Sequence, residues 1–124
     1  MATRSAIGYQ LPSGHIKAVY CHNDGYPTHQ LPILIKHYNT ISKVKDLIKP
    51  GQMSYLRTRA TWESYAENAR DPQPLYYHER GEKDRGPEIA KSIEEATKFW
   101  GDIWCEYLYV FVPDVGWTHY KTDH

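Results

Sequence analysis

Hydrophobic and polar residues alternate near both ends of the chain, and this pattern predicts a β-hairpin at each end. Residues 3–11 and 15–21 are two strand-like segments joined by the turn sequence PSG, in which proline fixes φ and glycine accepts a positive φ. Toward the other end, the run WCEYLYVFV (104–112) is followed by the turn sequence PDVG and by a second strand-like segment, WTHYK (117–121). We therefore expect an N-terminal and a C-terminal hairpin.

Three segments between the hairpins have apolar residues at the spacing of amphipathic helices. They are residues 28–38, 41–49 and 93–100, and their candidate N-cap residues are Thr28, Thr40 and Ser92. Glu95, three residues after Ser92, fits a capping box. The intervening segment is less regular: MSYL predicts one short turn, TWESYAENA a short helix and PLYYH (74–78) a strand.

The order of these elements predicts one α+β domain over residues 1–124. We expect an antiparallel sheet of about four to five strands, built from the two hairpins, with two to three helices packed on one face. A parallel sheet would require alternating strands and helices, which the pattern does not contain.

Composition narrows the classes of function. The 15 basic and 15 acidic residues cancel, whereas proteins that grip a long nucleic acid usually carry a basic face. The chain has two cysteines and no long apolar run, so we expect a cytoplasmic protein with reduced thiols. Eleven Tyr and four Trp supply aromatic surfaces that suit a pocket wall as well as a core.

The stretch YCHNDGYP (20–27) concentrates reactive side chains. His22 can transfer protons or bind a phosphate, and Asp24 could orient its imidazole. Gly25 lets the backbone approach closely, and Tyr26 presents a ring immediately before a predicted helix. The same residues are also common in turns, but the other polar and aromatic elements and the whole-chain pattern described below favour a site over a mere turn.

Two further groups of polar residues could complete a site. Arg4 and Ser5 lie on the first predicted strand, and the segment YYHERGEKDRG (76–86) offers Arg80 or Arg85 as a planar phosphate clamp. The candidate ligand-binding residues are Arg4, Ser5, Tyr20, His22, Asp24, Tyr26, His78, Arg80, Glu82, Tyr107 and Tyr109.

Several blocks together resemble one family. The pattern T-R-S-x-I-G (3–8) is followed by V-Y-C-H-x-D-G-Y-P (19–27), by R-G-E (80–82) and by Y-L-Y (107–109) with Trp117. In this combination the chain resembles a family of small proteins encoded mainly by tailed bacteriophages. The resemblance implies a phage accessory protein, and such proteins often inhibit a host protein or capture a nucleotide signal of the host's defence.

Several functions therefore stay open. The first is a binding protein that sequesters a small phosphorylated or nucleotide-like ligand, without a cofactor and as a homodimer. The second is an inhibitor that contacts a host protein through an aromatic surface. The third is a metal-independent phosphodiesterase with His22 as general acid or base and Asp24 as its orienting residue. A metal site of Cys21, His22, Asp24 and His29 is a fourth, although its spacing matches no zinc pattern.

Overall fold

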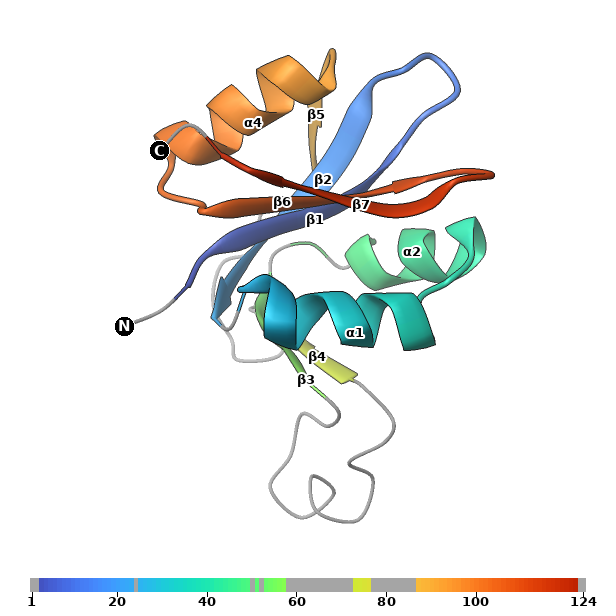
Figure 1. The fold of residues 1–124 in the computed structure, drawn as a ribbon, viewed down its shortest axis with the longest axis vertical. Helices are drawn as coiled ribbons and strands as arrows, with labels where there is room; N and C mark the ends of the chain where they lie inside the picture. Colours follow the sequence, from blue (N-terminus) through green and yellow to red (C-terminus); the bar gives the residue numbers. More distant parts are fainter. Residues whose placement is uncertain are drawn as a thin grey trace.

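A computed structural model describes residues 3–23, 25–49, 51, 53–57, 73–76 and 87–122. Within these residues the chain forms a seven-stranded mixed sheet with three α-helices (Figure 1). The strands are β1 (Ser5–Gln10), β2 (Ile16–Asn23), β3 (Met53–Arg57), β4 (Gln73–Tyr76), β5 (Glu88–Ala90), β6 (Tyr107–Val112) and β7 (Gly116–Lys121). The helices are α1 (Pro27–His37), α2 (Ile41–Ile48) and α4 (Ile93–Asp102).

The two terminal hairpins and the α+β fold are confirmed. β1 pairs antiparallel with β2, and Gly14 in the connecting turn has a φ of 92°. β6 pairs antiparallel with β7, and Gly116 closes that turn with a φ of 113°. Both glycines therefore occupy the left-handed region, which other residues enter at a cost.

The sheet is larger than expected and is not wholly antiparallel. Its order is β4-β3-β2-β1-β6-β7, and β5 pairs with β2 beside this path. β1 pairs parallel with β6, and β2 pairs parallel with β3. The hairpins thus join through a parallel contact that places β1 in the middle of the sheet, a long-range pairing that local sequence patterns do not encode.

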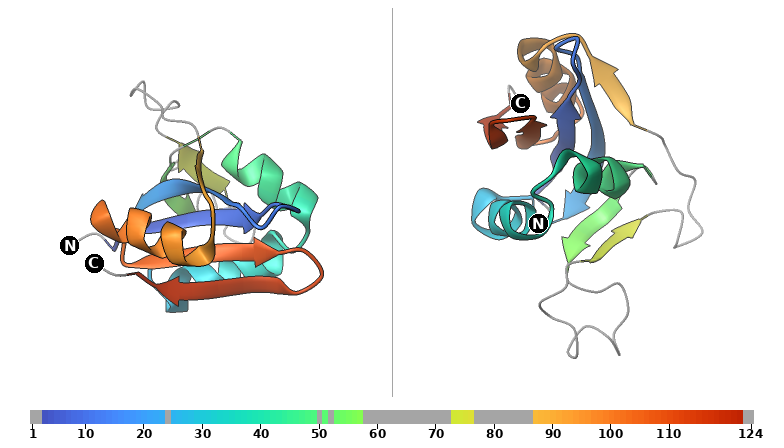
Figure 2. Two further views of the ribbon diagram at one scale, coloured as in Figure 1. Left: turned by 90° about the horizontal axis from the view of Figure 1, so that it is seen from above. Right: turned by 90° about the vertical axis from the view of Figure 1, so that its right-hand side faces the viewer.

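The helices cover both faces of the sheet, so the expectation of helices on one face was wrong. α4 lies on one side of the strands, and α1 and α2 lie on the other (Figure 1; Figure 2, left). One core cluster joins Ile7, Val19 and Tyr109 to Leu34 and Val44, and the other joins Ala6, Ala18 and Leu108 to Ala96 and Trp100. Because the central strands carry apolar side chains on both faces, both faces must be covered.

Local sequence explains where the helices begin. Thr40 caps α2 by accepting a hydrogen bond from the Lys43 N–H at 3.2 Å, as predicted. α1 instead begins at Pro27, with Tyr26 as the N-cap residue and no side-chain cap, so Thr28 is not the cap. Proline is already suited to the first helical position because its φ is fixed and its missing N–H is not needed there.

In the middle of the chain, one more prediction was wrong. The segment MSYL, expected to be a turn, is part of strand β3, which pairs with the end of β2. The predicted strand 74–78 corresponds to β4, and the predicted helix TWESYAENA lies outside the described residues. In the described part of the chain, none of the helices has the length and apolar character needed to cross a membrane.

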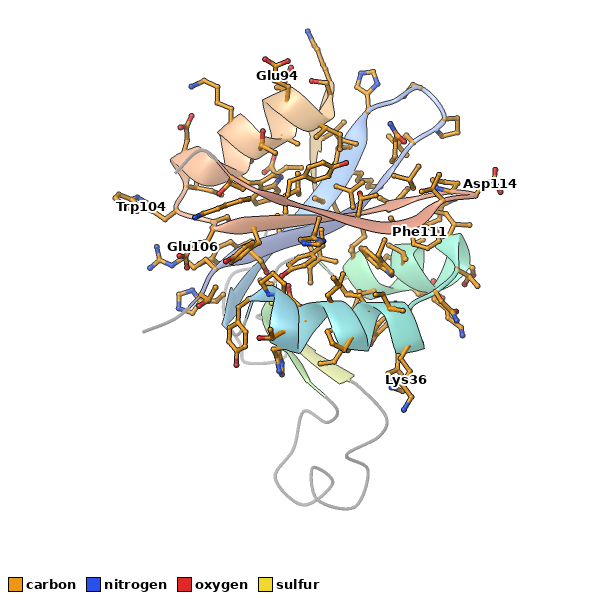
Figure 3. All side chains as sticks on the ribbon, in the orientation of Figure 1. Lys36, Glu94, Trp104, Glu106, Phe111 and Asp114 are labelled. Atoms are coloured by element: carbon orange, nitrogen blue, oxygen red, sulfur yellow. The ribbon has the colours of Figure 1, made fainter. Side chains whose placement is uncertain are left out.

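Trp104 ends α4 in an unfavourable backbone conformation. Its φ is 73°, and the Schellman pattern is complete: the Trp104 N–H bonds the Gly101 oxygen and the Cys105 N–H bonds the Trp100 oxygen, both at 3.0 Å. Glycine is the usual residue at this position, since a left-handed L-residue costs about 1–2 kcal/mol. The Trp104 side chain is 63% exposed and points away from the body of the protein (Figure 3).

We expect Trp104→Gly to raise the free energy of unfolding by about 1 kcal/mol, because it removes backbone strain and sacrifices little buried area. Urea denaturation followed by circular dichroism measures this change. Asp114, with a φ of 69° in the β6–β7 turn, is the matched control. Since aspartate tolerates the left-handed region, Asp114→Gly should gain less. A Trp104→Gly protein less stable than the wild type would contradict the prediction.

Candidate functional site

The turn between β2 and α1 is held in place by buried backbone contacts. The Gly25 N–H donates to the Thr3 oxygen at 2.9 Å, and the Tyr109 hydroxyl donates to the Gly25 oxygen at 2.6 Å. A β-carbon at position 25 would lie 2.6 Å from the Ser5 side chain, so only glycine fits without a shift. The turn is therefore fixed against both β1 and β6.

A buried polar network lies beneath this turn. The Ser5 hydroxyl donates to Gln30 Oε1 at 2.8 Å, and Gln30 Nε2 donates to Cys21 Sγ at 3.3 Å. Ser5, Gln30 and Cys21 are all fully buried. This network connects β1, β2 and α1, and it gives Ser5 an internal partner rather than an exposed position.

Gln30 was not among the expected site residues, although the sequence holds a signal for it. Gln30 is four residues before Leu34, and both side chains are buried on the same side of α1. A polar side chain on the apolar side of a helix requires a buried hydrogen-bond partner. That signal indicates a network but does not identify Ser5 and Cys21 as its other members.

Tyr20 and His22 form a pair on the opposite face of the sheet. The Tyr20 hydroxyl and His22 Nδ1 are 2.6 Å apart, and both side chains are half-buried. Tyr20 packs against the core cluster under α4, whereas Ser5 and Cys21 face α1. The stretch 20–27 therefore contributes to both faces of the sheet.

Arg4 lies beside this pair. The β1–β2 register pairs Ser5 with Cys21, and its continuation by one residue places Arg4 opposite His22, on the face that carries α4. On its other side the Arg4 carbonyl accepts a hydrogen bond from the Glu106 N–H at 2.8 Å. Arg4 is half-buried, and among the described residues we find no ion pair or hydrogen bond of its guanidinium.

The structure thus divides the candidate residues. Arg4, Tyr20 and His22 lie together on the α4 face, whereas Ser5, Tyr107 and Tyr109 lie on the α1 face. Tyr109 is fully buried, and its ring lies 6.2 Å from that of His119 in a stacked arrangement. Tyr26, at the turn, is 40% exposed and its ring lies 5.7 Å from that of His29. Asp24, His78, Arg80, Glu82 and Arg85 lie outside the described residues.

Three groups that are wholly or partly buried stay protonated well above neutral pH: the thiol of Cys105 and the phenols of Tyr38 and Tyr109. Burial, with Cys21 nearby, raises the pKa of Cys105 from 9.0 to about 12, against the lowering effect of Arg4. Burial likewise raises the pKa of Tyr38 from 10.0 to about 12. Burial, with smaller effects of Tyr107 and Cys21, also raises the pKa of Tyr109.

These shifts predict a loss of stability at alkaline pH. Each folded-state pKa lies above its unfolded value, so the stabilisation is complete below about pH 9 for Cys105 and is lost as the pH rises toward 12. We expect the urea midpoint of unfolding to be lower at pH 11 than at pH 8. The decrease should be smaller in Tyr38→Phe, because this variant lacks one of the titrating groups. An alkaline dependence that is identical in Tyr38→Phe and in the wild type would contradict this assignment.

A search of the described residues finds no group of three or more His, Cys, Asp or Glu side chains that could hold a metal ion. Comparison with known proteins likewise finds no matching family model, no matching curated protein and no matching solved structure. The function must therefore be argued from the arrangement of the side chains.

Proposed function

We propose that this protein binds a small phosphorylated or nucleotide-like ligand at the end of the sheet where Arg4, Tyr20 and His22 meet. The observation that carries the proposal is Arg4, a half-buried residue for whose guanidinium we find no hydrogen bond or ion pair among the described residues. A guanidinium has the planar set of donors that a phosphate group binds, and the β1–β2 register, continued by one residue, brings Arg4 next to His22.

Each of the three side chains has a role in this proposal. Arg4 supplies the planar fork of N–H donors that neutralises the anion. The Tyr20 hydroxyl and His22 Nδ1, which are 2.6 Å apart, are the polar groups of β2 that would lie next to the ligand. Tyr26 offers an exposed ring at the adjoining turn, and a base stacked on such a ring gains about 1–3 kcal/mol. The ligand needs neither Tyr107 nor Tyr109, which belong to the other face.

Glu106 restricts the kinds of ligand that the proposed site can bind. It lies half-buried immediately before β6 and next to Arg4, and the alternation of β6, continued by one residue, puts its side chain on the same face as Leu108. A carboxylate near Arg4 competes with a bound anion. The site therefore favours a ligand that offers hydrogen bonds and stacking in addition to charge, as a nucleotide does.

The first experiment is a retention assay. Purified protein is incubated with a panel of linear and cyclic nucleotides and with inorganic phosphate, then filtered, heated and analysed by chromatography. A nucleotide that leaves the filtrate and returns intact on heating supports binding. A nucleotide that returns cleaved indicates a phosphodiesterase, with His22 as the residue to test next. If the protein retains no nucleotide and alters none, the proposal is wrong.

Matched variants then test the site. Arg4→Gln should weaken binding roughly 10- to 100-fold, the loss typical of a hydrogen bond to a charged group. Lys121→Gln removes the same charge from an exposed residue. Because Lys121 pairs with Tyr107 on the other face of the sheet, this variant should bind the ligand as the wild type does. Glu106→Gln should tighten binding. Equal affinities of Arg4→Gln and Lys121→Gln, with both folds intact by circular dichroism, would exclude Arg4 from the site.

The resemblance to small phage proteins extends the proposal to a biological role. If the ligand is a nucleotide that signals infection, sequestration would remove it from the host's defence. We infer an anti-defence role on this ground alone, and co-expression of the protein with a nucleotide-dependent defence system, comparing the wild type with Arg4→Gln, is its test.

A further inference from the structure

A shallow groove lies between β5 and α4. Its lining residues are Glu88, Ile89, Ala90, Glu95, Phe99 and Trp100. Ala90 and Trp100 are almost completely buried and form an apolar floor, whereas Phe99 is 40% exposed and its ring meets that of Trp100 edge-on at 5.0 Å. The groove is therefore an apolar recess with an aromatic ring at its rim.

Two carboxylates border this apolar recess. Glu88 pairs with Ala18 in the β5–β2 register, which puts its side chain on the α4 side of the sheet, and Glu95 precedes Phe99 by one helical turn. The Ser92 hydroxyl accepts from the Glu95 N–H at 3.1 Å, but in the described residues the reciprocal bond from the Ser92 N–H to the Glu95 carboxylate is not found. Nor is an ion pair of either glutamate found there. Both negative charges are thus available to a cation.

The groove is small. Its cavity volume is about 40 Å³, far below the roughly 300–1,000 Å³ of typical small-molecule sites, so it has room for part of one side chain rather than for a whole small molecule. Beside it runs β5, which among the described strands pairs only with β2, so its second edge has backbone groups that an extended segment could pair with.

We propose that this groove docks a partner polypeptide by receiving one Arg or Lys side chain. The aliphatic part of that side chain packs on Ala90 and Phe99, and its charged group lies between Glu88 and Glu95. Long basic side chains bury their stem and keep their charge at a polar rim in this way, and a cation beside an aromatic ring is further stabilised. An apolar recess bordered by two carboxylates complements a side chain that has an apolar stem and a positively charged end, as Arg and Lys do.

The groove is separate from the proposed ligand site. β5 pairs with residues 16–18 at the start of β2, whereas Arg4 lies opposite His22 near the end of that strand. The two sites can therefore be inactivated independently, and failure of one proposal leaves the other standing.

The test uses the whole protein and three small probes. The probes are the blocked peptide Val-Arg-Val, the same peptide with citrulline in place of arginine, and free agmatine, which carries the guanidinium without a polypeptide backbone. Amide and indole resonances are followed by nuclear magnetic resonance during titration. We expect the arginine peptide to shift resonances of Glu88–Ala90 and of the Trp100 indole, with the citrulline peptide at least about fivefold weaker.

Variants assign the carboxylates. Glu88→Gln and Glu95→Gln should each weaken the arginine peptide roughly two- to fivefold, the range of an exposed ion pair. Glu94→Gln is the control, because Glu94 lies on the same helix, points away from the sheet (Figure 3) and does not line the groove. Equal binding of the two peptides, unchanged binding by both variants, or no shift at these residues would overturn the proposal. Agmatine binding as tightly as the peptide would overturn its polypeptide part.

Discussion

Replacing Gly8 by alanine is expected to destabilise the protein by about 3 kcal/mol or more, the upper end of the cost of overpacking. Gly8 lies in β1, directly opposite Ala18 of β2. A β-carbon at Gly8 would lie 2.0 Å from the Lys17 carbonyl oxygen and 2.6 Å from the Ala18 β-carbon. The first of these is a backbone atom, so the contact is relieved only by moving β1 away from β2.

The position of β1 makes this separation costly. β1 is hydrogen-bonded to β2 on one side and to β6 on the other, and both core clusters include its side chains. Urea denaturation of Gly8→Ala measures the loss. Gly14→Ala is the control, because nothing lies within 4 Å of a β-carbon there and only the positive φ opposes alanine. That control should lose about 1 kcal/mol, and an equal or smaller loss in Gly8→Ala would refute the steric explanation.

Replacing Gln30 by methionine, which has nearly the same shape, is expected to cost about 2–3 kcal/mol. The variant removes the acceptor of the Ser5 hydroxyl and the donor to Cys21, and all three side chains are fully buried. A buried polar group left without a partner costs about 1–3 kcal/mol. The Ser5 hydroxyl, which then has lost its Gln30 acceptor, accounts for most of the expected loss.

A double variant distinguishes this cause from simple misfit. Ser5→Ala combined with Gln30→Met removes both polar partners, so it should be more stable than Gln30→Met alone, because replacing both partners by apolar groups is often nearly neutral. Denaturation of the wild type, the two single variants and the double variant gives the coupling energy directly. Additive losses in the double variant would show that Ser5 and Gln30 act separately.

Parts of the fold that depend on residues close together in the sequence could be predicted, and parts that depend on distant residues could not. The N-terminal hairpin and the caps Thr40 and Ser92 depend on residues within a few positions of each other, and these were predicted correctly. The parallel pairing of β1 with β6 and the short strand β3 depend on distant partners, and these were missed. Local chemistry determines turns and caps, whereas the neighbour of a strand depends on the packing of the whole chain.

The candidate site shows the same limit. The stretch 20–27 was predicted to be a site, with Gly25 letting the backbone approach closely, and the close approach is confirmed, since a β-carbon at Gly25 would lie 2.6 Å from the Ser5 side chain. The sequence could not show that alternation along β2 sends Tyr20 and His22 to one face and Cys21 to the other core. Nor could it join Arg4 to His22, since that neighbourhood exists only through the register of β1 with β2.

The placement of β1 also has a consequence for how the chain reaches its native state. β1 is synthesised well before β6, which pairs with it from Ser5 opposite Tyr107 to Tyr9 opposite Phe111. Contacts between such distant segments slow folding, and during synthesis an edge of β1 stays open to incorrect pairing. We therefore expect the nascent chain to depend on chaperones until β6 is available, and to fold cooperatively, as a single late event.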